Sequence, residues 1–319
     1  MSLAPRAAAG AALRIRQRLP MRLLRRLSSV ALALALADLA AIHRAAITRA
    51  FTQAAAADHR WLAAAVAAEA VSILAYVLIV RRLLAIGGVG ASLLSLTGTT
   101  VAGIALLNTL PAGQAVSSGY WFQQLHRRGA ARGVAAVALF GAGLVGALSL
   151  VVLTAIGFLI GGSAHGALAA ARTPVLVGAA IFIATRVFAH RPLKRGLCWM
   201  VRRLTGDETT YPIAAVKPRE YVALALLGYV NWIFDCLVLV FALDAVHAAA
   251  PWRAILVVYA LAQLATAVPI LPGGGGTVEA SLTLGLATYG AHGAVAAAIV
   301  IFRVISAWAF VPIGLLVWG

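Results

Sequence analysis

The residues with the clearest capacity for chemistry lie in the segment 271–280, where turn-forming and polar residues break an apolar run. They are one proline, four consecutive glycines, a threonine and an acid: Pro272, Gly273, Gly274, Gly275, Gly276, Thr277 and Glu279. Inside a bilayer, irregular backbone is tolerated only where protein or a water-filled cavity covers it, and an acidic residue there indicates a functional site. The glycines let the backbone approach a ligand, and a helix starting near Thr277 presents unpaired N–H groups that favour an anion. We therefore predict that this segment binds a phosphate-bearing group.

The role of Glu279 stays open, because an ionised carboxylate would repel a phosphate. With Gly276 as the N-cap, Glu279 falls at the third helical position, where glutamate is favoured and can cap the helix. Two further alternatives are that Glu279 binds a cationic headgroup or that it carries a proton. For the glycines, the simpler alternative is that they only permit close packing of helices.

A second broken segment occurs 161 residues earlier, counted from Pro272 back to Pro111. Both segments share the pattern Leu-Pro-small-Gly, and each proline is followed eighteen residues later by a glycine, Gly129 or Gly290. Interrupted apolar segments at corresponding positions of two halves indicate the binding site of many transporters. The helix after the first break would add serine hydroxyls, so the predicted binding residues there are Pro111, Gly113, Ser117 and Ser118.

The composition places both segments in a membrane. Of 319 residues, 63% are hydrophobic and 11% are charged, whereas soluble domains have about 25% charged residues. Apolar stretches near or above the length of a membrane crossing occur at 27–42, 61–84, 132–160, 173–190, 221–243 and 293–318. We predict an all-α polytopic membrane protein with about six full transmembrane helices. The broken segments, 92–125 and 253–290, are predicted to be two re-entrant helical hairpins related as an inverted repeat; proline-kinked spanning helices are the alternative.

The charge distribution predicts the orientation of the chain. Basic residues gather in short clusters between spans, as the positive-inside rule expects, and the resulting topology places both termini in the cytoplasm. We predict a basic cytoplasmic segment at 1–27 and a single transmembrane domain at 28–319, with inverted halves at about 61–160 and 221–318. A signal peptide is the alternative for the N-terminus, but Asp38 interrupts its apolar run and many spans follow, which favours a retained helix. Arginine greatly outnumbers lysine, which indicates GC-rich coding and a bacterial cytoplasmic membrane.

Five charged residues fall within predicted spans: Asp38, Glu69, Arg186, Asp235 and Arg303. Each would cost roughly 2.5–3.5 kcal/mol at the bilayer centre, so these side chains are expected to face protein or water and to form pairs. The leading pair is Arg303 with either Glu279 or Asp235, and Arg186 is a further candidate. Asp38 and Glu69 lie nearer the outer ends of their predicted spans, where snorkelling or solvation explains them as well as function does.

Other chemistry is sparse in this sequence. The net charge of +17 is spread between the spans and does not indicate nucleic-acid binding. Seven histidines and two cysteines show no metal-ligand spacing, and no nucleotide-binding or hydrolase motif occurs. We therefore expect no metal, no cofactor and no catalytic residues, so that the protein is not an enzyme.

The run 271–280 resembles the Pro-Gly-Gly-x-Gly-x-x-Glu-Ala signature of the lysylphosphatidylglycerol synthase transmembrane family, also called flippase-like proteins. Residues 108–113, followed by Tyr120 and a turn at Arg127, Arg128 and Gly129, resemble the first motif of that family. The likeness covers about residues 30–318 and implies the membrane domain that moves aminoacylated phosphatidylglycerol between leaflets. Residues 1–319 contain no counterpart of the aminoacyl-transferring domain of the full-length synthases, so lipid lysylation is not expected of them. Residues 114–118 depart from the Gly-Glu-Arg-like run of many members, so the resemblance does not predict which headgroup is bound.

Residues and resemblance together predict a flippase-like lipid transporter. It would move a phospholipid or lipid-linked phosphate headgroup between leaflets through a midplane site formed by the two hairpins. Its partners would be phosphate-bearing membrane lipids, and a homo-oligomer stays open. The alternatives are an intramembrane enzyme acting on a lipid-linked phosphate or sugar, and a membrane partner protein that transports nothing.

Overall fold

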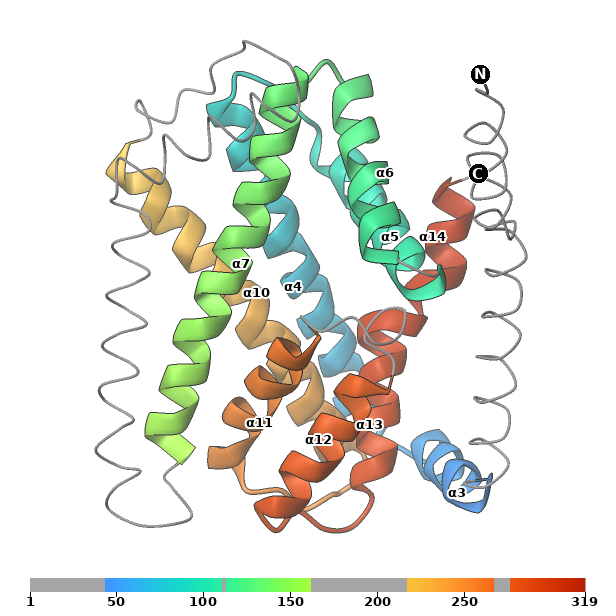
Figure 1. The fold of residues 1–319 in the computed structure, drawn as a ribbon. Coiled ribbons are helices and arrows are strands. Elements are labelled where there is room, and N and C mark those ends of the chain that lie inside the picture. Colours follow the sequence, from blue (N-terminus) through green and yellow to red (C-terminus); the bar gives the residue numbers. More distant parts are fainter. Residues whose placement is uncertain (1–43, 111–112, 162–216, 267–275, 319) are drawn as a thin grey trace, which may run out of the picture. The chain divides into compact units, whose positions relative to one another are not determined.

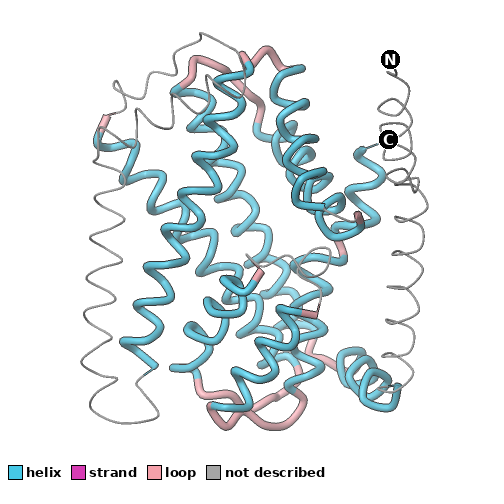
Figure 2. The backbone as a smooth tube through the Cα atoms, viewed as in Figure 1, coloured by secondary structure: helices cyan, strands magenta, loops and turns pink. Residues whose placement is uncertain are grey.

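The computed structural model describes residues 44–110, 113–161, 217–266 and 276–318. In these ranges every regular element is a helix, and short loops join the helices (Figure 2). The predicted all-helical fold class is thus confirmed. The predicted spans 27–42 and 173–190 lie outside the described residues.

The chain divides into two compact units, residues 1–52 and 53–319. The second unit holds all the helices that matter for the site (Figure 1). In chain order the helices are α3 (Arg44–Ala55), α4 (His59–Ile86), α5 (Leu93–Thr109), α6 (Gly113–Arg127), α7 (Arg132–Gly161), α10 (Pro218–Ala245), α11 (Trp252–Ala265), α12 (Thr277–Thr288), α13 (Val295–Arg303), the π-helical turn η3 (Val304–Trp308) and α14 (Phe310–Trp318).

Among the described residues, four apolar helical runs are long enough to cross a membrane: His59–Ile86, Arg132–Ile160, Pro218–Ala245 and Val295–Gly314. Helices α4 and α10 have 28 residues each, which at about 1.5 Å per residue exceeds the roughly 30 Å of a hydrocarbon core. The fourth run passes from α13 through η3 into α14. The chain is therefore a multi-pass integral membrane protein, as predicted.

Helices α5, α6, α11 and α12 form two pairs of shorter helices. They have 17, 15, 14 and 12 residues respectively. At about 1.5 Å per residue, each is shorter than the roughly 30 Å that a complete crossing requires. Helix α5 packs against α6 and α11 against α12, and the two pairs extend from opposite ends of the unit toward its middle (Figure 1).

The second unit contains two runs of helices in the same order. In each run, α4 to α7 and α10 to α14, a long helix is followed by two short helices and a final long run. The long helices α4 and α10 lie along each other in opposite directions and make the most extensive contact between elements (Figure 1). The first short helix of each run packs on the last helix of the other: α5 on α14, and α11 on α7. The contact that the first run makes with the second is thus repeated by the second run with the first.

The second short helix of each run, α6 or α12, ends in the same type of glycine turn. Gly129 follows α6 with φ 86°, and Gly290 follows α12 with φ 80°. In both turns, backbone N–H groups after the helix donate back to carbonyls of its last turn. A residue in the left-handed conformation is a common way to satisfy these carbonyls, and glycine adopts it without steric strain. The two glycines that follow the prolines by eighteen residues therefore terminate equivalent helices.

Two clusters of buried hydrophobic side chains stabilise the unit. One includes Trp121 and Leu125 among α4 to α7, and the other includes Tyr259 and Phe302 among α10 to α13. Residues of α4 and α10 belong to both clusters. The central pair of long helices therefore connects the cores on which the short helices pack.

Candidate functional site

Polar side chains meet where α4 and α10 cross. Asn231 on α10 donates through Nδ2 to the Ser72 hydroxyl at 2.9 Å and to the Ser72 carbonyl at 3.1 Å. Ser72 on α4 is buried. In apolar surroundings either group alone would lack a partner, so this bond favours one register between the two helices.

Asp235, one turn further along α10, is the centre of a buried cluster. Its carboxylate accepts hydrogen bonds from the Tyr259 hydroxyl and from Gln263 Nε2, the latter at 2.9 Å. Tyr259 and Gln263 are four residues apart on α11, so they lie on the same face of that helix. Donors on adjacent turns of α11 therefore hold the Asp235 carboxylate.

Glu69 faces Asp235 from α4 and is only 5% exposed. The two carboxyl groups interact directly, and Glu69 Oε2 is buried without a hydrogen-bond partner among the described residues. Of the two explanations left open for Glu69, solvation or snorkelling does not fit its burial. The reason is tertiary, because α10 packs along α4 and covers the face on which Glu69 lies.

An ion pair between Arg303 and Glu279 joins α13 to α12. Arg303 Nε donates to Glu279 Oε1 at 2.8 Å, and the two side chains are 9% and 27% exposed. Arg303 also interacts electrostatically with Asp235. The Arg303 guanidinium thus forms an ion pair with Glu279, and its positive charge also acts on Asp235. Glu279 Oε2 is buried and has no hydrogen-bond partner in the part of the chain that the structure describes.

The turn before α12 places Glu279 within reach of Arg303. Gly276 is the N-cap of α12 with φ 78°, and Glu279 is the third helical residue, as the sequence predicts. A positive φ of this size is unfavourable for residues with a Cβ atom, which explains the glycine. Since the Glu279 carboxylate is directed to Arg303, pairing rather than helix capping is the role that the structure assigns to it.

The start of α6 is built differently from the start of α12. A Cβ atom on Gly113 would lie 2.2 Å from a backbone carbonyl oxygen of α5, so only glycine fits. The Ser117 hydroxyl donates to the Gly103 carbonyl at 2.9 Å. The Ser118 hydroxyl donates to the Gln114 carbonyl at 2.8 Å. Both hydroxyl protons are engaged with the backbone, so in this conformation they are not available to a headgroup.

Arg128 links the turn after α6 to the first turns of α5. From the turn after α6 it donates through Nε to Ser95 Oγ and through Nη2 to Thr99 Oγ1, both at 2.8 Å, near the start of α5. This arginine belongs to the turn that the sequence matches to the first family motif. Its contacts indicate a structural role in holding α5 and α6 together.

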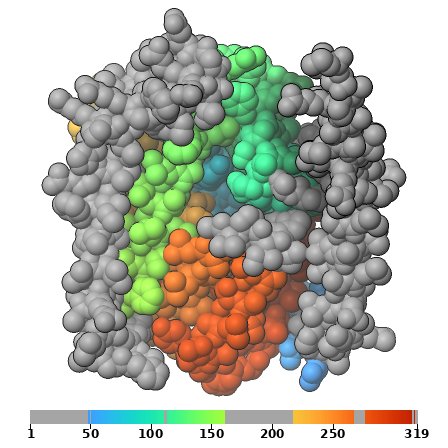
Figure 3. Space-filling view, viewed as in Figure 1, coloured from blue at the N-terminus to red at the C-terminus, as the bar shows by residue number. Residues whose placement is uncertain are grey.

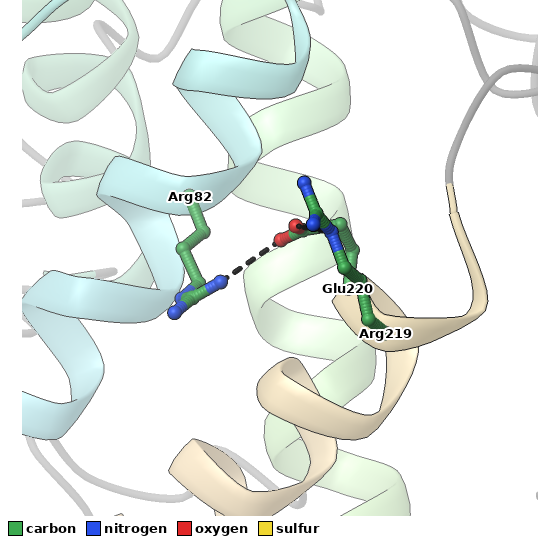
Figure 4. A network of polar contacts seen from close by, with 3 residues as sticks. All are labelled: Arg82, Arg219 and Glu220. Carbon is green, nitrogen blue, oxygen red and sulfur yellow. Dashed lines mark hydrogen bonds and ion pairs between the residues drawn. The ribbon is translucent and has the colours of Figure 1, made fainter.

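A separate ion pair lies near the ends of α4 and α10. Arg82 donates to Glu220 at 2.9 Å, and Arg219 lies 3.5 Å from the other oxygen of the same carboxylate (Figure 4). The Arg82 side chain is 46% exposed, so solvent screens its interaction with Glu220. This contact is a surface feature and does not belong to the buried cluster.

The predicted binding residues at the starts of α6 and α12 are described, and the turns between the short helices are not. Those at the helix starts are Gly113, Ser117, Ser118, Gly276, Thr277 and Glu279. Pro111, Pro272, Gly273, Gly274 and Gly275 lie outside the described residues, as do Asp38 and Arg186. The turn residues therefore stay predictions.

Sequence reasoning named the charged members of the cluster and missed the neutral residues that hold them. Tyr259, Gln263 and Asn231 are single polar residues within apolar helices, where each taken alone carries little information. One signal is present, because Tyr259 and Gln263 have the four-residue spacing of a helix face. The completed cluster sets three carboxyl groups and one guanidinium in apolar surroundings, an arrangement suited to holding a cation or a proton.

Comparison with known proteins identifies one family over most of the chain. The family described as lysylphosphatidylglycerol synthase TM region matches residues 23–314. The predicted resemblance is thus confirmed. A search of curated proteins found no match.

Proposed function

Because the chain belongs to the lysylphosphatidylglycerol synthase transmembrane family, we propose that it is a lipid transporter of the flippase type. It moves a phospholipid or lipid-linked phosphate headgroup between leaflets through a site near the membrane midplane. The observation that carries this proposal is the arrangement of two short helix pairs from opposite ends, with a buried charged cluster beside α12.

In this proposal each short helix pair is a re-entrant hairpin. The short lengths of α5, α6, α11 and α12 support it, and so does their packing in sequential pairs. Proline and glycine fall at the connections, where broken backbone needs the cover of surrounding protein. In transporters, broken helices of this kind commonly supply the substrate site.

The two runs of helices are proposed to be inverted repeats. Ser72 and Asn231 each occupy the fourteenth position of a 28-residue helix, and they hydrogen bond to each other. Equivalent residues can meet in this way where a two-fold axis passes between them. Because α4 and α10 run in opposite directions, that axis would lie in the membrane plane. The exchanged packing of α5 on α14 and of α11 on α7 agrees with the same symmetry.

The proposed topology has six full spans, including 27–42 and 173–190, with both termini in the cytoplasm of a bacterial cell. Support for the orientation comes from exposed arginines such as Arg81, Arg127 and Arg219, which lie where α4 and α6 finish and where α10 begins. A cluster of arginines at one end of the spans is typical of the cytoplasmic side.

The proposed site lies between the starts of α6 and α12, where free backbone N–H groups would bind a phosphate. In the space-filling view the surface is hollowed between α6 and α7, and α4 is visible at the floor (Figure 3). We take this hollow as a route by which a headgroup enters from the side. The ligand is a phosphate-bearing lipid that leaves chemically unchanged, so the protein is proposed to be a transporter and not an enzyme; a homo-oligomer is compatible with this mechanism.

The test is lipid movement in liposomes that contain the purified protein and a headgroup-labelled phosphatidylglycerol. A membrane-impermeant quencher reports how fast the inner-leaflet label reaches the outside. The wild type is expected to exceed protein-free liposomes, and Glu279→Gln to fall to the protein-free rate. Glu220→Gln is the matched control, because it removes a carboxylate at the surface and should leave the rate unchanged.

Two results would contradict the proposal. Movement at the protein-free rate in the wild type would favour a partner protein without a substrate. A new lipid product in mass spectra of the same liposomes would favour the intramembrane enzyme.

A further inference from the structure

We propose that the buried carboxyl pair of Glu69 and Asp235 binds one exchangeable proton, and that Arg303 compensates for its release by moving from Glu279 toward the pair. The proposal of a proton site does not depend on the proposed transport function. The coupling of this site to lipid movement rests on the proposed transport function.

The hydrogen bonds determine which carboxyl group holds the proton. Two ionised carboxylates repel each other and only accept hydrogen bonds, so two adjacent buried carboxyl groups need a proton between them. Asp235 already accepts hydrogen bonds from Tyr259 and Gln263, which suits an ionised carboxylate. Glu69 Oε2 is buried and has no such donor among the described residues, so we assign the proton to Glu69, whose O–H group would donate to Asp235.

The charges of the cluster require the same proton. Glu69, Asp235 and Glu279 supply three carboxyl groups, and Arg303 supplies the guanidinium that acts on them. Among the described residues, Cys236 and Tyr259 also have titratable side chains that interact with Asp235. If all three carboxyl groups were ionised, they would exceed the Arg303 guanidinium by two negative charges among the described residues of the cluster, and buried charges need partners. A proton on Glu69 removes one of them.

Release of the proton to water at one membrane face would leave two adjacent carboxylates, and a cation must then approach. The guanidinium of Arg303 already interacts with Asp235 and is bound to Glu279. Arg303 is also directly followed by the π-helical turn η3, a type of irregularity that is frequent at functional sites. A small shift of Arg303 toward Glu69 would stabilise the ionised pair and free the Glu279 carboxylate at the start of α12.

Movement of Arg303 between Glu279 and the carboxyl pair would make headgroup binding at the proposed lipid site depend on protonation of the pair. With Arg303 on Glu279, the start of α12 presents a neutralised carboxylate beside free N–H groups and favours an anionic headgroup. With Arg303 drawn to the pair, the exposed negative charge of Glu279 would repel that headgroup. Proton binding and headgroup binding would therefore favour each other.

The proton site is tested by infrared spectroscopy of the purified full chain, which detects the C=O stretch of a protonated carboxylic acid. We expect a band at neutral pH that disappears in Glu69→Gln and changes frequency in Asp235→Asn, because the acceptor changes. Glu220→Gln is the control that should leave the band unchanged. Gel filtration and circular dichroism establish that each variant is folded. If Glu69→Gln does not fold, labelling of wild-type Glu69 by a carbodiimide selective for protonated carboxyls in apolar sites replaces it. Absence of both the band and the label would overturn the proposal.

Coupling is tested separately with the liposome assay and an imposed pH gradient. We expect the gradient to change the wild-type rate by about tenfold and to have no effect on Glu69→Gln. A wild-type rate that ignores the gradient, or that follows a sodium gradient instead, would overturn the coupling while leaving lipid transport intact. If no lipid moves at all, the proposed function fails, and the infrared result still decides the proton site.

Discussion

The two runs of helices, α4 to α7 and α10 to α14, have the same order and packing of helices. They differ in the side chains that they bury at equivalent positions. Asp235 is the eighteenth residue of α10, and its equivalent in α4 is Tyr76, which packs edge-on against Trp121 at 6.2 Å. Glu69 is the eleventh residue of α4, and its equivalent in α10 is Gly228. The carboxyl groups of the cluster thus come from both runs, Glu69 from the first and Asp235 and Glu279 from the second, and neither Glu69 nor Asp235 has an acidic equivalent in the other run.

This difference shows that the proposed internal symmetry depends on the backbone, whereas the buried charges depend on individual side chains. Features shared by both runs are helix lengths, glycine turns and close backbone contacts, which depend on backbone geometry. Features of one run alone are side chains at single positions, which can change without altering the packing plan. Changes to shared features should therefore have similar effects in both runs, whereas a change to a residue of the charged cluster should not be matched by the same change at its equivalent in the other run.

The largest effect is expected from Arg303→Met. Removing one partner of a buried ion pair leaves the carboxylates uncompensated and typically costs about 3–5 kcal/mol. Thermal unfolding in detergent would measure the loss. Arg128→Met is the matched change in the first run, and its cost should be smaller because Arg128 bonds to hydroxyl and carbonyl groups rather than to a carboxylate. Equal losses in the two variants would show that the runs do not differ in buried charge.

An intermediate loss of stability, similar in both runs, is expected from Gly314→Ala at the α5–α14 contact and from Gly157→Ala at the α7–α11 contact. A Cβ on Gly314 would lie 2.5 Å from Ala105 Cβ, and one on Gly157 would lie 2.9 Å from the Val257 backbone nitrogen. Overpacking of this kind costs about 1–3 kcal/mol. Gly143→Ala on α7 is the control, because nothing lies within 4 Å of its new Cβ. A large loss in one of the two contacts and none in the other would break the proposed symmetry.

The smallest effect is expected from Arg82→Ala, which removes the ion pair with Glu220 (Figure 4). Because Arg82 is nearly half exposed, solvent screening should limit the loss to at most about 0.5 kcal/mol. The same unfolding measurement in low and high salt would check this. A loss as large as that of Arg303→Met would mean that the surface pair, and not the buried cluster, holds α4 to α10.

Much of the fold follows from local sequence patterns. Long apolar runs predict the spanning helices, and the Pro-Gly segments predict where α6 and α12 begin. Gly276 as N-cap places Glu279 at the third position of α12, as the sequence indicates. The burial of Glu69 and the donors Tyr259 and Gln263 could not be predicted in this way. They depend on which faces of α4, α10 and α11 meet, and helical periodicity in apolar sequence does not distinguish one apolar face from another.

By itself the sequence determined that the chain lies in a membrane, where its helices break, and which acidic and basic residues need partners. These are local consequences of apolar length, of proline and glycine, and of the cost of a charge in lipid. Only the tertiary structure decided which partners meet. The antiparallel register of α4 and α10 brings Glu69 to Asp235, and the approach of α13 to α12 brings Arg303 to Glu279. The physical reason is that each of these contacts joins residues on separate helices, so it depends on how the helices pack and not on the pattern within any one of them.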